Sequence, residues 1–255
     1  MPLTLLTVPC LSDNYAYLLH DDVSGKTAVI DVPEVGPIQA AAEVRGWTIT
    51  DIWITHHHDD HIGGVDALRK ATGARVTGAR ADDHRLPNLD DPVEAGDIFM
   101  FDEAKVEVLD VPGHTIGHIA FHVPDAKVAF TADTLMGLGC GRLFEGTPAQ
   151  MWDSLTRLAA LPEDTTICSG HEYSTGNAKF AVTVDPDNTD LATRLADIEA
   201  KRAEGEPTIP TQLDLELRTN PFLRASNSRI RAHLGMDDAT DVEVFAEIRR
   251  RKDSF

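Results

Sequence analysis

The chain has 255 residues, of which 42% are apolar, which is enough for one large core or for one domain with a smaller second one. Its formal net charge of −19 argues against binding that relies on phosphate contacts to a basic surface, so we expect no nucleic-acid partner. No apolar run approaches the roughly 20 residues that span a bilayer, and the N-terminal stretch lacks a signal-peptide pattern, so we expect no membrane partner.

In chain order, short β-rich runs alternate with turn residues as far as about residue 135. An opening strand is expected to pair with a second strand that starts near Asn14. Helical patterns cover residues 37–44, which stop near Gly46, and residues 65–70, which stop at Gly73. Further buried strands are expected at residues 28–31, 51–54, 106–109, 119–123, 128–130 and 166–168.

The last third of the chain changes character. Residues 188–203, 225–234 and 241–252 have helical periodicity, and a turn-rich linker covers residues 205–210. We therefore expect a mixed α+β domain over residues 1–172 and a small helical domain over residues 173–255.

The three cysteines, Cys10, Cys140 and Cys168, are odd in number and far apart. This spacing predicts no disulfide framework and fits a reducing, cytoplasmic environment. We expect each thiol to be a small buried apolar group.

Residues 55–64 read THHHDDHIGG, which crowds four histidines and two aspartates into six positions. In an extended segment His56 and His58 point the same way, whereas His57 points elsewhere. Asp60 and His61 follow as the chain turns into a helix expected to begin near Ile62. Imidazole and carboxylate ligands together suit zinc, iron or manganese.

Three other strands end in possible ligands, namely His114, Asp133 and His171. One predicted metal site consists of His56, His58 and His114, and a second consists of Asp60, His61 and His171, with Asp133 between them. The alternative is a solvated polar turn or an adventitious metal-binding tract. It is disfavoured because such a tract would not need ligands at three other strand ends.

The other histidines are expected to lie outside the ligand set. His118 is expected either to orient a ligand or to have a structural role, and the sequence does not separate the two. The residues expected not to bind metal are His20, His57, Asp59, His84, His122 and His233.

The segments THHHDDHIGG, PGHT (112–115), TAD (131–133) and GHEY (170–173) together resemble the metallo-β-lactamase superfamily. The resemblance implies a four-layer αβ/βα sandwich with two metal ions at one edge. It does not fix a substrate, because one fold hosts many functions.

Further segments resemble one branch of the superfamily, glyoxalase II or hydroxyacylglutathione hydrolase. They are CGRLFEGT (140–147), GEPTIP (205–210), NPFLR (220–224) and RRRKD (249–253). The resemblance implies hydrolysis of S-(2-hydroxyacyl)glutathione, in particular S-D-lactoylglutathione, to glutathione and D-lactate, the second step of methylglyoxal detoxification. It also implies two divalent ions per chain, with zinc favoured and iron or manganese as alternatives, and a monomer is expected.

Glutathione carries two carboxylates, so its site needs fixed cations. From the residues alone, the cations at 249–252 could equally serve to stabilise a helix C-terminus. The resemblance favours Arg249 and Lys252 as carboxylate ligands, with Arg250 and Arg251 solvated.

The resemblance further implies that Arg142, Phe144 and Tyr173 line the glutathione site. Many family members carry lysine and tyrosine where this chain has Arg142 and Phe144. Phe144 has no hydroxyl, so a hydrogen bond worth roughly 0.5–1.5 kcal/mol is expected to be missing.

The expected catalytic residues are Asp60 and Asp133. Two bound ions bridged by Asp133 would lower the pKa of a shared water from 15.7 towards about 7, and Asp60 would orient the resulting nucleophile and accept its proton. Two rival functions remain: an iron-dependent sulfur dioxygenase using mainly His56, His114 and Asp133, and a non-catalytic scaffold that binds glutathione conjugates. The seven-ligand set and the long helical tail argue against the first rival. The completeness of the ligand set argues against the second.

Overall fold

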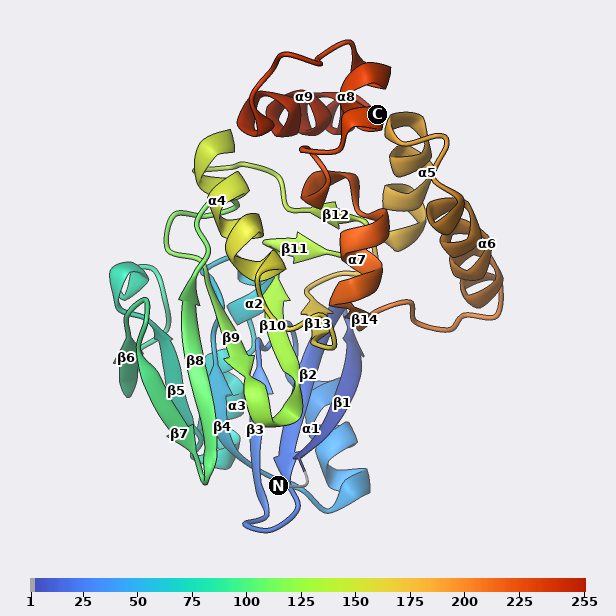
Figure 1. The fold of residues 1–255 in the computed structure, drawn as a ribbon. Helices are drawn as coiled ribbons and strands as arrows, with labels where there is room; N and C mark the ends of the chain where they lie inside the picture. Colours follow the sequence, from blue (N-terminus) through green and yellow to red (C-terminus); the bar gives the residue numbers. More distant parts are fainter. Residues whose placement is uncertain (1–2) are drawn as a thin grey trace. The chain divides into compact units, whose positions relative to one another are not determined.

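A computed structural model describes residues 3–255 (Figure 1). The chain divides into two compact units. The first consists of Met1–Asp110 and Gly117–Ala132, and the second of Val111–Ile116 and Asp133–Phe255. This division differs from the expected domain boundary at residue 172, which stays a prediction.

The first unit holds a sheet of six strands in the order β1-β2-β3-β4-β5-β6. Strands β1 to β3 pair antiparallel, and β3 to β6 pair parallel. The strands are β1 (Leu3–Cys10), β2 (Asn14–Asp21), β3 (Lys26–Ile30), β4 (Thr48–Trp53), β5 (Arg75–Ala79) and β6 (Asp91–Val93). The intervening helices are α1 (Val35–Arg45), α2 (Asp59–Ile62), α3 (Val65–Thr72) and η1 (Arg80–Asp82).

Four antiparallel strands of a second sheet complete this unit, in the order β7-β8-β9-β10. They are β7 (Ile98–Phe101), β8 (Ala104–Asp110), β9 (Ile119–Val123) and β10 (Val128–Ala132), with η2 (Pro124–Ala126) between the last two.

Strand β4 shows why the two sheets of this unit pack together. Ile52 of the strand and Ile54, which directly follows it, join one buried apolar cluster with Ile38 of α1 and Leu68 of α3. Trp53 points to the opposite face, where its ring contacts Phe99, Phe101, Phe121 and Phe130 of the second sheet. A strand buried on both faces reads as a continuous apolar run rather than an alternating one, which explains the sequence IWI.

The second unit combines short strands with six helices among the described residues (Figure 1). The strands are β11 (Leu135–Met136), β12 (Gly139–Cys140), β13 (Thr166–Ser169) and β14 (Thr211–Gln212). The helices are α4 (Pro148–Ala159), α5 (Ser174–Val184), α6 (Thr189–Ala203), α7 (Leu213–Thr219), α8 (Ser228–Leu234) and α9 (Asp241–Asp253), with η3 (Pro221–Leu223). Phe222 of η3 contacts the rings of Phe180 in α5 and Phe245 in α9, and Phe245 also contacts Trp152 in α4.

A buried polar network ties the β11–β12 hairpin to these helices. Glu216 of α7 pairs with Arg194 of α6 and accepts a hydrogen bond from the Leu138 backbone at 2.9 Å. Asn220 donates to the carbonyls of Met136 at 3.2 Å and Gly139 at 3.0 Å. The hairpin that follows Asp133 is therefore held by side chains some eighty positions further along the chain, since buried polar groups need partners.

The helix expected near Ile62 begins earlier. Helix α2 starts at Asp59, so Asp60 and His61 lie inside its single turn. Acidic residues are favoured in the first turn because the backbone N–H groups there carry partial positive charge. Among residues 3–255, no helix combines the length and the apolar composition needed to cross a membrane.

Candidate metal centre

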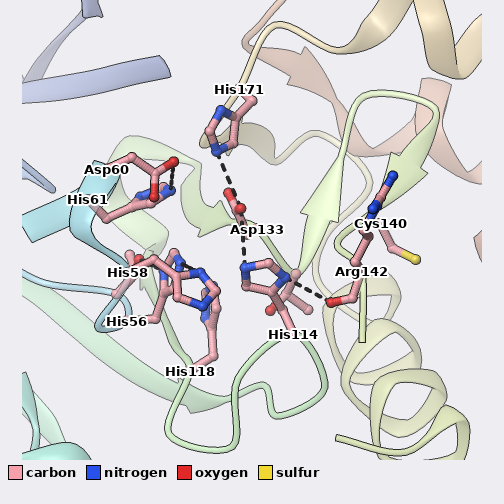
Figure 2. Close-up of polar contacts among 12 residues, drawn as sticks. His56, His58, Asp60, His61, His114, His118, Asp133, Cys140, Arg142 and His171 are labelled. Carbon is pink, nitrogen blue, oxygen red and sulfur yellow. Dashed lines mark hydrogen bonds and ion pairs between the residues drawn. The ribbon is translucent and has the colours of Figure 1, made fainter. Parts of the chain in front are cut away.

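The first unit contributes a group of histidines on the loop that leaves β4 (Figure 2). His56 Nε2 lies 3.2 Å from His58 Nδ1. Two ligands held about 2.0–2.1 Å from one tetrahedral ion lie roughly 3.3–3.4 Å apart, so this separation suits a shared divalent ion. His57 between them points instead to Asp82.

Asp31, at the end of β3, orients this group. Its carboxylate accepts hydrogen bonds from the Thr55 backbone at 2.9 Å, the Thr55 hydroxyl at 2.8 Å and His61 Nδ1 at 2.8 Å. A carboxylate on one ring nitrogen leaves the other nitrogen as the metal-facing atom and fixes the direction of the ring. Asp31, His56 and His61 can also place donor atoms within 4.8 Å of one another.

Asp31 was not among the residues predicted for the site. The sequence feature that could have identified it is its position as a charged residue directly after the apolar run AVI (residues 28–30). Its φ of 56° is a second sign, because a non-glycine residue in the left-handed region is often held there for function.

Asp60 and His118 complete the group in the first unit. Asn14 Nδ2 lies 3.1 Å from both the backbone carbonyl and the Oδ2 atom of Asp60, and the Asp60 side chain is 43% exposed. The buried His118 ring stacks on His56, with centroids 4.5 Å apart and planes 14° apart. His118 therefore supports the His56 ring.

The second unit contributes Asp133 between two histidines (Figure 2). Asp133 Oδ2 lies 3.4 Å from His114 Nε2 and 3.3 Å from His171 Nε2, and all three side chains are buried. Both separations match the spacing of two ligands on one tetrahedral ion. His114 Nδ1 donates to the Arg142 carbonyl at 2.9 Å, which leaves Nε2 to face the carboxylate.

Gly141 shows how tightly the chain closes around these ligands. A Cβ atom at this position would lie 2.1 Å from the Asp133 carbonyl oxygen and 2.8 Å from His114 Nδ1. Only glycine lets the backbone pass there, so the segment that carries Arg142 is held against two proposed ligands.

Two exposed aromatic rings flank these histidines. Phe144 is 64% exposed and its ring lies 5.3 Å from that of His114. Tyr173 is 42% exposed and stacks on His171 at 4.7 Å, with the planes 4° apart. Large exposed aromatic side chains beside candidate ligands are the kind of surface that a substrate covers.

The basic residues of α9 separate into two pairs. Lys252 Nζ donates to the Gly176 carbonyl at 3.1 Å, and burial lowers the pKa of its ammonium, as do the nearby cations Arg249 and Arg142. Arg249 is buried, donates to the Cys140 carbonyl at 2.9 Å and pairs with Asp253 at 2.8 Å.

Arg250 and Arg251 instead both pair with Glu247 at 2.7 Å. Their side chains are 68% and 40% exposed, respectively.

Three other histidines that are expected not to bind metal, His20, His122 and His233, have partners of their own. His20 stacks on Trp47, the His122 ring contacts Glu107 at 2.9 Å, and the His233 ring contacts the Thr183 carbonyl at 3.0 Å.

The cysteines are buried, as expected. Burial raises the pKa of the Cys10 and Cys140 thiols to about 11 and that of Cys168 well above its usual value.

Comparison with known proteins assigns both parts of the chain. Residues 12–171 match the metallo-beta-lactamase superfamily, and residues 172–255 match the family described as the hydroxyacylglutathione hydrolase C-terminus. A hydroxyacylglutathione hydrolase of Cereibacter sphaeroides is 61% identical over 255 residues, which cover 100% of both chains.

Solved structures share the fold. The B3 metallo-beta-lactamase BLEG-1 superposes with a TM-score of 0.67 at 20% identity, over 86% of this chain and 99% of that one. TTHA1623 in a di-iron-bound form gives a TM-score of 0.63 at 26% identity, over 86% of this chain and 100% of that one.

The expected α+β fold of two sheets with helices, followed by a helical C-terminal region, is thus confirmed. The identity over the full length of both chains decides between the branches of the superfamily. The chain belongs to the hydroxyacylglutathione hydrolase, or glyoxalase II, family of thioester hydrolases within the metallo-β-lactamase superfamily.

Proposed function

We propose that the chain hydrolyses the thioester of S-D-lactoylglutathione to glutathione and D-lactate, as in the second step of methylglyoxal detoxification. The observation that carries the proposal is the buried Asp133 carboxylate, held between His114 and His171 at ligand-to-ligand spacing. Family membership supplies the substrate class, because the fold alone does not define one.

The proposed metal ligands are those expected from the sequence. His56, His58 and His114 would hold one divalent ion, Asp60, His61 and His171 the other, and Asp133 would be shared. The donors are imidazoles and carboxylates, which suit zinc, iron or manganese, and we propose zinc. When bound, such ions lower the pKa of water and polarise the carbonyl of the substrate.

The chain's own groups would then direct the reaction. The Asp60 carboxylate reaches solvent while Asn14 anchors it, so it can orient an attacking water and accept its proton. Attack at the thioester carbonyl forms a C–O bond, and the C–S bond then breaks. A thiol with a pKa of about 8.5 leaves as thiolate with little help from an acid.

We propose that the glutathione moiety binds on the second unit. Burial lowers the pKa of Lys252, and Arg249 and Arg142 lie close enough to lower it further, so the three cations would form a positive cluster on an acidic chain. Phe144 and Tyr173 would cover the apolar part of the ligand. In this proposal residues 1–172 form the catalytic domain, which also contributes Arg142 and Phe144 to substrate binding, and residues 173–255 form the substrate-binding domain. The protein would act as a cytoplasmic monomer.

The test combines elemental analysis with hydrolysis rates on a panel of thioesters, for the parent and for Asp133→Ala. We expect two equivalents of metal and a preference for S-D-lactoylglutathione in the parent, and a joint loss of metal and hydrolysis in the variant. Full activity of the variant with fewer metal ions would contradict the two-metal site. Oxygen uptake with glutathione persulfide, without thioester hydrolysis, would favour the dioxygenase instead.

A further inference from the structure

His57, the middle residue of the histidine triplet 56–58, belongs to a group of three side chains that contact one another. His57 Nδ1 lies 3.3 Å from Oδ2 of Asp82, which is only 3% exposed. Arg85 Nη2 donates to Asp82 Oδ1 at 2.7 Å, and Arg85 Nη1 lies 3.3 Å from His57 Nε2. Each of the three side chains therefore contacts the other two.

The chemistry of arginine fixes which way the His57 ring faces. A guanidinium only donates hydrogen bonds, so His57 Nε2 faces it as an acceptor and Nδ1 is the atom turned toward Asp82. His57 Nε2 thus contacts Arg85 while Nδ1 faces Asp82, so the His57 ring points away from the group formed by His56 and His58.

The same carboxylate also packs against the loop that carries His118. A Cβ atom on Gly117 would lie between 2.1 and 2.4 Å from the Asp82 carboxylate atoms, so only glycine allows this approach. The next residue, His118, stacks on the His56 ring. Asp82 thus contacts the histidine triplet through His57, and it contacts the loop whose ring supports His56.

We propose that Asp82, with Arg85, is a positioning residue for the ligands His56 and His58. Neighbouring side chains of an extended segment point to opposite sides, so fixing the direction of His57 fixes the directions of His56 and His58. Their 3.2 Å convergence then depends on a carboxylate that touches neither metal nor substrate. This inference rests on the proposed ligand role of His56 and His58.

Asp82→Asn in the full-length, zinc-loaded protein tests the proposal. Asparagine has the shape of aspartate, but its amide group would donate toward either His57 or Arg85. One of the two contacts that Asp82 makes would therefore be lost. We expect metal affinity, measured by chelator competition, to fall about 10–100-fold. We also expect kcat to fall with KM for S-D-lactoylglutathione unchanged, and the visible spectrum of the cobalt-substituted protein to shift.

The matched control is Asp83→Asn, since Asp83 is an exposed neighbour in the same turn. It should leave metal affinity, spectrum and kcat at parent values. Arg85→Gln, at a partly exposed position, serves as the second variant if Asp82→Asn does not fold, and it should change the same three readouts in the same direction.

Parent-like metal affinity and cobalt spectrum in the folded variants would overturn the proposal. His58→Ala separates this failure from a failure of the proposed function. If His58→Ala loses metal while the Asp82 and Arg85 variants keep parent-like metal affinity, only the positioning role is refuted. Full metal content in His58→Ala would remove both.

Discussion

Lys252 is the residue at which the glutathione proposal can be tested most cleanly. Its ammonium lies over the Phe180 ring at 5.3 Å and close to the other two cations of the cluster, so a ligand carboxylate there would offset charge repulsion. Lys252→Met should raise KM for glutathione thioesters roughly tenfold or more, because hydrogen bonds to charged groups contribute about 1.5–3 kcal/mol. Steady-state kinetics with parallel metal analysis checks this, with metal content unchanged.

Arg250→Met is the control for that experiment, because Arg250 is exposed and pairs with Glu247. Its KM should equal that of the parent. Arg249→Met should also raise KM, but Arg249 holds the Cys140 carbonyl as well, so the loss would include packing. An unchanged KM in Lys252→Met would refute the assignment.

Phe144, a second proposed glutathione contact, allows a substitution that should increase affinity. Its ring is largely exposed, so a hydroxyl can be added without a clash. Phe144→Tyr should lower KM for S-D-lactoylglutathione by roughly two- to tenfold, the equivalent of one restored hydrogen bond of about 0.5–1.5 kcal/mol. Phe144→Leu keeps the position apolar and should show no such gain. Equal KM values for the tyrosine variant and the parent would mean that position 144 does not face the ligand.

At the level of elements, periodicity predicted some helices and missed others. The expected helices at 188–203 and 241–252 are confirmed as α6 and α9. Both could be predicted because they have polar outer faces and begin at side-chain caps, Asn188 and Thr240. Helix α5 was not predicted, because glycine, threonine and valine lower its helix propensity. It forms because Phe180 and its neighbours are buried, a tertiary effect that a local pattern does not contain.

The last turns of α9 predict an acid-sensitive contribution to stability. Hydrogen bonds from Arg250 and then Arg251 lower the pKa of Glu247 from 4.5 to about 2. A carboxyl whose pKa is depressed in the folded state stabilises the fold above its unfolded value, and that contribution is lost as pH falls from about 4.5 to about 2.

Glu247→Gln should therefore be less stable than the parent at pH 7, and the difference should shrink as pH falls below about 4.5 and disappear only below about pH 2. Urea unfolding followed by circular dichroism across this range measures the change. A stability difference that is independent of pH would show that the ion pairs do not contribute.

Part of the candidate site could be predicted from the sequence, because the proposed ligands follow strands. The apolar runs that precede His114, Asp133 and His171 were enough to predict that these residues lie at strand ends. The orienting groups could not be found in this way. Asp31 meets His61, and Asp82 meets His57, across thirty and twenty-five positions of chain, and such pairs are set by tertiary packing rather than by a local pattern.

For the whole molecule, the proposed ligand set predicts that bound metal would stabilise the fold. An ion that binds the folded chain at 100 times its Kd adds about 2.7 kcal/mol to stability. Removing metal with a chelator should then lower Tm by roughly 5–10 °C in a chain of this size, and zinc should restore it. Differential scanning calorimetry on matched samples checks the shift. An unchanged Tm after verified metal loss would show that metal binding does not contribute to the stability of the fold.

The burial of all three thiols has a consequence for a protein that handles activated acyl groups. A thioester passes its acyl group to any accessible thiolate, and the thiolate is the reactive form of cysteine. With a pKa of about 11, the Cys10 and Cys140 thiols are ionised to only about one part in ten thousand at pH 7. The chain is thereby protected from trans-acylation by its own substrate, and water is left as the acceptor of the acyl group.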